Sequence, residues 1–207
     1  MDGVANEIPA SGNNTSQSTW KEVAQEKKLA GIRHFPQEGS KFATVYGPVN
    51  STLETPVFNT IGMSAAEAKL EYYQAFYLCA GASILVELSL DGGANYTETL
   101  LSYSGQSDTG ITIVRPSGNP NNCNNYDPIN DGYNFVSIDL TPYLNEATLR
   151  VKFSFFGTAG GSCSGTFNDN SGTLPCSSIT RTVSSSWAID GLRLPFAPID
   201  EILALTE

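Results

Sequence analysis

Large apolar residues recur at alternate positions in three segments of the chain. They are Leu70, Tyr72, Phe76 and Leu78; Ile84, Val86, Leu88 and Leu90; and Leu149, Val151, Phe153 and Phe155. A period of two is the pattern of a β-strand that buries one face. Shorter strands are predicted over 42–46, 53–58, 96–103, 111–114, 133–140 and 187–194. No long helix is predicted: residues 20–30 fit either a short helix or an edge strand, and residues 141–144 fit a single helical turn.

The predicted strands are short and are separated by turns rich in Gly, Pro and Asn, which is typical of an all-β fold. The pattern favours an antiparallel β-sandwich of the jelly-roll type, with long polar loops over 104–132 and 157–186. In the last strand the apolar alternation slips by one residue at Asp190-Gly191. Such a slip predicts a β-bulge at this point.

Residues 89–96, Ser-Leu-Asp-Gly-Gly-Ala-Asn-Tyr, join two of the predicted strands. They have the Ser-x-Asp-x-Gly-x-x-aromatic pattern of an Asp-box hairpin, with Tyr96 where Trp is usual. The two glycines supply the positive backbone dihedrals of a tight turn. We expect Asp91 to bond back to loop amides and Tyr96 to fold under the turn, so the motif predicts architecture and no chemistry.

The polar ends of the chain mark the expected limits of the domain. Residues 1–18 are rich in Ser, Asn, Thr and Gly and have no period, so they are predicted to be a flexible linker. The jelly-roll domain is predicted over 19–194, and 195–207 is either an exit linker or the start of a next module. The first residues have no signal-peptide pattern, so we expect a fragment of a longer protein.

Composition narrows the classes of partner. The chain has 207 residues, with 21 acidic against 11 basic and a net charge of −10. This charge argues against nucleic acid as a partner, because the phosphates would be repelled. No apolar run approaches the ~20 residues of a membrane helix, so no membrane insertion is expected. Abundant Asn, Ser, Thr, Gly and Tyr are typical of a secreted all-β domain.

The chain has four cysteines, an even number that suggests two disulfides in a secreted domain. Cys163 and Cys176 flank a Gly/Ser/Thr-rich stretch and are therefore paired, which leaves Cys79 with Cys123. Three connectivities remain possible. Zinc is a weaker alternative because there is no Cys-x-x-Cys and a single His, and reduced cysteines would fit a compartment that is not oxidising.

Several motifs occur in an order that resembles a known class of module. They are Phe42-Ala43, the stretch Ser51 to Pro56, the Ser89 to Tyr96 box, Ile138 to Tyr143, Leu149 to Phe153, and Trp187-Ala188-Ile189-Asp190-Gly191. The set resembles MAM-like and galactose-binding-like jelly-roll modules, as found in bacteroidete surface adhesins and type IX secretion cargo. The resemblance implies a secreted or cell-surface location. Tyr96 and the long 157–186 segment depart from the pattern.

The resemblance also implies a calcium site. Related jelly rolls often bind Ca²⁺ with the Asp of the Ala-Ile-Asp motif, here Asp190, and Glu38 and Glu22 lie in the region that would supply further oxygens. Calcium takes 6–8 oxygen ligands, many of them backbone carbonyls. The alternative is that Asp190 only hydrogen-bonds the predicted bulge.

Residues 119–132 gather amide and carboxylate groups around one tyrosine. In this stretch Asn124, Asn125, Asp127 and Asp131 are candidates either to hold Ca²⁺ or to hydrogen-bond a sugar, and Tyr126 is a candidate to stack on that sugar. The alternative is a cluster of solvated turns, which such polar stretches commonly form.

Catalysis finds little support in the sequence. There is one His, and neither Gly-x-Ser-x-Gly nor His-Glu-x-x-His occurs. We therefore expect a non-catalytic extracellular adhesion or binding module whose partners are a glycan or cell-surface ligand and the neighbouring domains of its own chain. The alternative is a carbohydrate-binding accessory domain of a secreted hydrolase, with a glycosidase itself as the more remote case.

Overall fold

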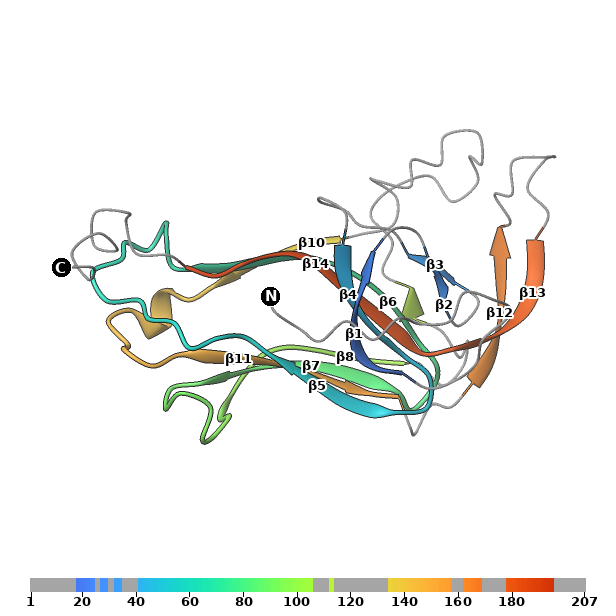
Figure 1. Cartoon of the computed structure of the whole chain (residues 1–207), viewed down its shortest axis with the longest axis horizontal. Coiled ribbons are helices and arrows are strands. Elements are labelled where there is room, and N and C mark those ends of the chain that lie inside the picture. The colour runs from blue at the N-terminus through green and yellow to red at the C-terminus, as the bar shows by residue number, and fades with distance from the viewer. Residues whose placement is uncertain are drawn as a thin grey trace.

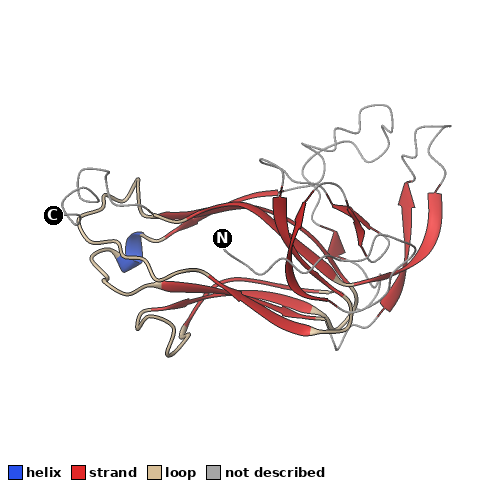
Figure 2. Ribbon diagram, viewed as in Figure 1, coloured by secondary structure: helices blue, strands red, loops and turns tan. Residues whose placement is uncertain are grey.

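The computed structural model describes residues 18–24, 27–29, 32–34, 41–105, 112–113, 134–157, 162–168 and 178–195. Over these residues the protein is built from antiparallel β-strands, and its two main sheets stack face to face (Figure 1). The only helix in the described part is the short 3-10 helix Thr141–Tyr143 (Figure 2). No helix there is long and apolar enough to cross a membrane. The predicted all-β sandwich is confirmed.

The strands are β1 (Ser18–Ala24), β2 (Lys27–Leu29), β3 (Ile32–His34), β4 (Lys41–Tyr46), β5 (Asn50–Glu54), β6 (Lys69–Leu78), β7 (Ser83–Ser89), β8 (Glu98–Ser104), β9 (Thr112–Ile113), β10 (Asn134–Asp139), β11 (Arg150–Phe156), β12 (Ser162–Asn168), β13 (Ser178–Ser184) and β14 (Ser186–Arg193). One sheet, the β14 sheet, has the order β1-β4-β14-β6-β10, and β9 also pairs with β6. The other, the β11 sheet, has the order β5-β11-β7-β8.

The order of the strands is that of a jelly roll. Strands β4, β5, β6, β7, β8, β10, β11 and β14 can be counted from one to eight along the chain. Counted in this way, they lie in the order 1-8-3-6 in the β14 sheet and 2-7-4-5 in the β11 sheet. Chain-distant strands therefore become neighbours, as Greek-key connections require.

The core lies between the two sheets and contains the apolar faces predicted from alternation. The inward residues of β6, Leu70, Tyr72, Phe76 and Leu78, are all buried. The Trp187 ring on β14 lies 5.3 Å from that of Trp20 on β1 and 5.8 Å from that of Phe153 on β11, centre to centre. One tryptophan therefore joins both sheets and the edge strand β1.

Of residues 20–30, the structure describes 20–24 and 27–29, and these form strands. β1 pairs with β4 at the edge of the β14 sheet, and the short strands β2 and β3 form a separate hairpin. The edge-strand alternative is thus the correct one for the first part of this segment.

The strand predicted over 53–58 lies earlier in the chain in the structure, at Asn50–Glu54. This strand, β5, pairs with β11, and Thr55 still donates its N–H to the Val151 carbonyl at 2.9 Å. The next pairing is an isolated bridge between Phe58 and Leu149, the residue before β11. Pro56 explains the break, because proline has no N–H to donate to the ladder.

The polar segment 157–186 was predicted as a loop, and this was wrong in part. Strands β12 and β13 pair along their full lengths, from Ser162 opposite Ser184 to Asn168 opposite Ser178. The β-branched residues of β13 favour a strand, although they follow no clear apolar alternation. Figure 1 shows this hairpin at the end of the sandwich opposite the 3-10 helix.

Candidate functional site

The outer face of the β14 sheet, which points away from the core, carries a compact group of aromatic and polar side chains. Residues directly opposite each other on neighbouring strands share a face. Phe135 on β10 lies opposite Tyr73 on β6, and Tyr73 lies opposite Asp190 on β14. The neighbouring row consists of Ser137, Glu71 and Arg193.

Tyr73 and Phe135 form an aromatic pair on this face. Their ring centres are 5.2 Å apart, with an angle of 54° between the ring planes. Phe135 is 48% exposed, so a large apolar ring faces solvent beside a second ring. On its other side Tyr73 packs, together with Ala75, against the small buried cluster of Phe42 and Ala188. Ala188 lies opposite Ala75, on the same face as Tyr73, so this packing is a lateral contact along the outer face of the sheet.

Polar groups surround the aromatic pair. The Ser137 hydroxyl donates to Glu71 Oε1 at 3.3 Å. Asp139, one row further along β10, accepts from the Thr141 hydroxyl and backbone N–H. These two hydrogen bonds hold the pKa of the Asp139 carboxyl below its usual range. The face therefore offers two rings in one row and a hydroxyl and carboxylates in the next rows, a set that can bind a ligand with apolar and hydroxyl-bearing surfaces.

Asp190 lies at the bulge predicted in β14. The pairing of β14 with β6 shifts register between Asp190 and Arg193, and Gly191 has a φ of +57°, which suits glycine. The Asp190 carboxylate accepts the Gly191 N–H at 2.8 Å and is 8% exposed. The predicted bulge is confirmed, and Asp190 hydrogen-bonds it.

The structure does not bring Glu22 to Asp190. Glu22 lies opposite Ala43, and Ala43 lies opposite Ile189, whose side chain points into the core. Because successive residues of a strand point to opposite faces, Glu22 and Asp190 lie on opposite faces of the sheet. Glu22 pairs instead with Lys41, with 2.7 Å between Oε1 and Nζ.

The rest of the predicted calcium site is outside the described residues, because Glu38 is not among them. No group of three or more His, Cys, Asp or Glu side chains in the described part is arranged to hold a metal ion. The described residues do not form a set of calcium ligands, so we assign no role to the ion from them.

The residues predicted to bind a sugar, Asn125, Tyr126 and Asp127, also lie outside the described residues. They belong to the stretch of chain that leads into β10 and Phe135.

Cys79 is buried and disulfide-bonded. Cys123 and Cys176 lie outside the described residues, and Cys163 is described only through the backbone pairing of β12. The pairs Cys79–Cys123 and Cys163–Cys176 therefore stay predictions.

The Asp-box hairpin has the predicted geometry and forms a rigid turn. The Ser89 hydroxyl donates to Asp91 Oδ1 at 2.6 Å and accepts the Gly93 N–H at 2.8 Å. Asp91 also accepts from the backbone and side chain of Asn95 at 2.8 and 2.7 Å. The bonds from Ser89 and then from Asn95 hold the pKa of Asp91 well below its usual range.

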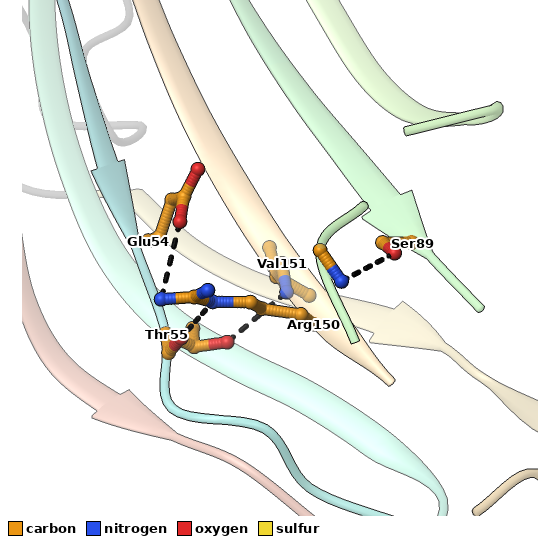
Figure 3. A network of polar contacts seen from close by, with 6 residues as sticks. Glu54, Thr55, Ser89, Arg150 and Val151 are labelled. Carbon is orange, nitrogen blue, oxygen red and sulfur yellow. Dashed lines mark hydrogen bonds and ion pairs between the residues drawn. The ribbon is translucent and has the colours of Figure 1, made fainter. Parts of the chain in front are cut away.

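Next to this turn, charged side chains tie the strands of the β11 sheet together. Arg150 pairs with Glu54 at 3.1 Å and donates from Nε to the Thr55 carbonyl at 2.8 Å (Figure 3). The Lys152 ammonium lies 4.1 Å from the centre of the Tyr96 ring. Burial, and then the Glu54 carboxylate, raises the pKa of Tyr96 to about 12. These contacts tie the turn to the strands of the β11 sheet.

The aromatic pair was not among the residues predicted from sequence. Tyr73 and Phe135 both lie on predicted strands, at positions that alternate with buried residues. An aromatic residue at an outward position was the available signal. What sequence alone could not give was the register that sets Phe135 opposite Tyr73.

Comparison with known proteins identifies no family. No protein-family model matches the chain, and no curated protein matches it. Among solved structures it is similar to TmCBM61, a carbohydrate-binding module in complex with β-1,4-galactotriose, at 9% identity and a TM-score of 0.28, over 84% of this chain and 86% of that one. It is also similar to the VP2 subviral particle of infectious bursal disease virus, at 12% identity and a TM-score of 0.25, over 90% of this chain and 37% of that one. Values this low carry no information about what this chain binds.

Proposed function

We propose that this protein is a non-catalytic, glycan-binding jelly-roll module of a larger secreted or cell-surface protein. The observation that carries the proposal is the pair Tyr73 and Phe135, with Phe135 48% exposed on a sheet face lined by polar groups. Large apolar side chains exposed beside polar ones commonly mark binding sites.

The chemistry of this face matches that of a sugar ring. A pyranose has C–H groups on its faces, which pack on aromatic rings, and hydroxyls on its rim, which need hydrogen-bond partners. The rings of Tyr73 and Phe135 supply the first contact. Glu71 and Ser137, in the next row, supply acceptors and a donor for the second.

The loop that precedes β10 belongs to the same proposal. Asn125, Tyr126 and Asp127 are proposed to add contacts to the ligand, because their stretch of chain leads into the strand that carries Phe135. Loops on rigid scaffolds commonly carry recognition residues. Adhesion through such a contact, at the cell surface, is the role we propose for the module.

A glycan array tests the proposal. The full chain is applied beside Phe135→Ala and a control variant, Phe156→Ala. Phe156 is 38% exposed and is the last residue of β11, in the other sheet. Its removal therefore shows the effect of losing an exposed aromatic ring away from the proposed site. We expect binding by the wild type and Phe156→Ala and a loss of about tenfold or more in Phe135→Ala, since a stacked ring contributes on the order of 1–3 kcal/mol.

Two results would reject this function. One is a wild-type chain that binds no glycan on a broad array. The other is binding that Phe135→Ala leaves unchanged.

A further inference from the structure

We infer that the ligand is a linear oligosaccharide that lies along β6 and β10, with one sugar on the aromatic pair and the next sugars over the polar side chains beyond it. The inference rests on the proposed function and adds the shape of the ligand and the residues of its further subsites. It is carried by the exposure and the register of the outward side chains of these two strands.

The open part of the outer face follows β6 and β10. Toward β4 the outward residues are buried: Phe42 and Thr44 point to this face, as does Ala188 opposite Thr44, and all three are shielded from solvent. On β10 the outward residues are all exposed, and they are Phe135, Ser137 and Asp139. The surface that a ligand can reach is therefore a strip along these two strands, which we call the open strip.

Three rows of side chains cross the open strip. From one end they are Tyr73 with Phe135, then Glu71 with Ser137 and Arg193, and then Lys69 with Asp139. Successive outward residues of a strand are about 7 Å apart, so about 13 Å separate the first row from the third. This span is longer than one sugar ring. A ligand that contacts all three rows must therefore have several sugar units in a line.

The open strip favours a ligand that lies along the strands over one that crosses them. Beside Tyr73 in the first row lies Asp190 on β14, which is 8% exposed and offers little surface to a ligand. Along β6, the next outward residue is Glu71, which is partly exposed, and Arg193 opposite it is exposed. A sugar chain that begins on the rings thus gains contacts by extending toward Lys69.

The two polar rows match the hydroxyls of the sugars beyond the stacked one. Glu71 lies opposite Arg193, and Asp139 lies opposite Lys69, so each row pairs a carboxylate with a cation. The carboxylates accept hydrogen bonds and the cations donate them, whereas a sugar hydroxyl can do both. Hydrogen bonds to ionised groups are roughly twice as strong as those between neutral groups. Each added sugar that reaches a row should therefore add affinity.

A series of fragments of one glycan that binds on the array, from monosaccharide to tetrasaccharide, tests the inference. Affinities for the full chain are measured by calorimetry, with the monosaccharide measured as a competitor of the trisaccharide. The variants are Glu71→Gln, Phe135→Ala and the control Glu146→Gln, which removes one negative charge in the loop after the 3-10 helix. We expect wild-type affinity to rise about tenfold or more from monosaccharide to trisaccharide and to change little at the tetrasaccharide.

The variants assign the rise to the second row. Glu71→Gln should weaken the trisaccharide about fivefold or more and the monosaccharide less than about twofold, whereas Glu146→Gln should weaken neither. Phe135→Ala should weaken every member of the series alike.

The inference is overturned if affinity does not rise with length, or if Glu71→Gln weakens the monosaccharide as much as the trisaccharide. In either case a loss in Phe135→Ala still supports glycan binding. If no glycan binds the wild type, or Phe135→Ala binds like it, the proposed function itself fails.

Discussion

At the scale of single residues, the core of this β-sandwich contains polar atoms that its apolar surroundings do not satisfy. Gln74, on the inward face of β6, is fully buried and accepts the Trp187 indole N–H at 3.2 Å. Its Nε2 and the Tyr72 hydroxyl have no hydrogen-bond partner among the described residues. The alternation on β6 predicts that the side chain at position 74 points inward. It does not predict that this side chain accepts a hydrogen bond from Trp187, because Trp187 lies on β14, which is far away in the sequence.

The Tyr72 hydroxyl gives the first prediction. Burial raises the pKa of Tyr72, and its ring packs edge-on against Phe153 at 5.3 Å. Burying a hydroxyl without a partner costs about 1–3 kcal/mol, so Tyr72→Phe should leave the free energy of unfolding unchanged or raise it by about 1 kcal/mol. Urea unfolding measures this, with Tyr143→Phe as the control, because the Tyr143 hydroxyl does have a partner in Glu98 at 3.3 Å. A loss above about 1 kcal/mol in Tyr72→Phe would show that the hydroxyl is bonded in solution.

Calcium at Asp190 is also a question about one residue, and it stays a prediction from the sequence. If the ion binds, a chelator should lower the melting temperature, since a ligand at a hundred times its dissociation constant stabilises by about 2.7 kcal/mol. Asp190→Asn should remove this sensitivity while keeping an oxygen for the Gly191 N–H. Identical melting curves of the wild type with and without chelator would exclude a structural calcium ion.

At the scale of elements, local sequence patterns predict a strand correctly where that strand has one apolar face and ends at a clear turn. The Asp-box turn and the bulge in β14 follow from a few adjacent residues, and both were predicted. The β12-β13 hairpin was missed because its residues show no apolar alternation, and β5 was misplaced because Pro56 interrupts its ladder.

The Asp-box turn predicts a dependence of stability on pH. The pKa of Asp91 in the folded protein lies well below its usual value, because its carboxylate accepts hydrogen bonds from Ser89 and Asn95. The ionised carboxylate therefore stabilises the fold at pH values above that usual pKa. This contribution is lost as the pH falls through the folded pKa. Thermal melts at about pH 7 and about pH 3 should therefore show a smaller acid-induced decrease in Asp91→Asn than in the wild type.

Part of the decrease should remain in Asp91→Asn, because hydrogen bonds also lower the pKa of Glu67 and Asp139. An acid-induced decrease in the variant equal to that of the wild type would contradict the assignment to Asp91.

At the scale of the whole molecule, the candidate site depends on topology more than on any segment. Alternation predicts that Tyr73 and Phe135 point outward, but jelly-roll connections make β6 and β10 neighbours, and the register of that pairing sets the two rings opposite each other. Composition argues against nucleic acid as a partner but locates no binding site. The sequence therefore predicted the scaffold, whereas the site required the assembled sheet.

The central claim is that a glycan binds on the outer face of the β14 sheet. Its most direct test is a map of backbone amide shifts by NMR as a neutral oligosaccharide that binds on the array is added to the full chain. We predict the largest shifts at 71–73 and 135–137, with further shifts in 119–132 if that loop contributes. The claim would be contradicted by shifts that occur only on the outer face of the β11 sheet. It would also be contradicted by shifts that occur only in loops while the residues of β6 and β10 show none.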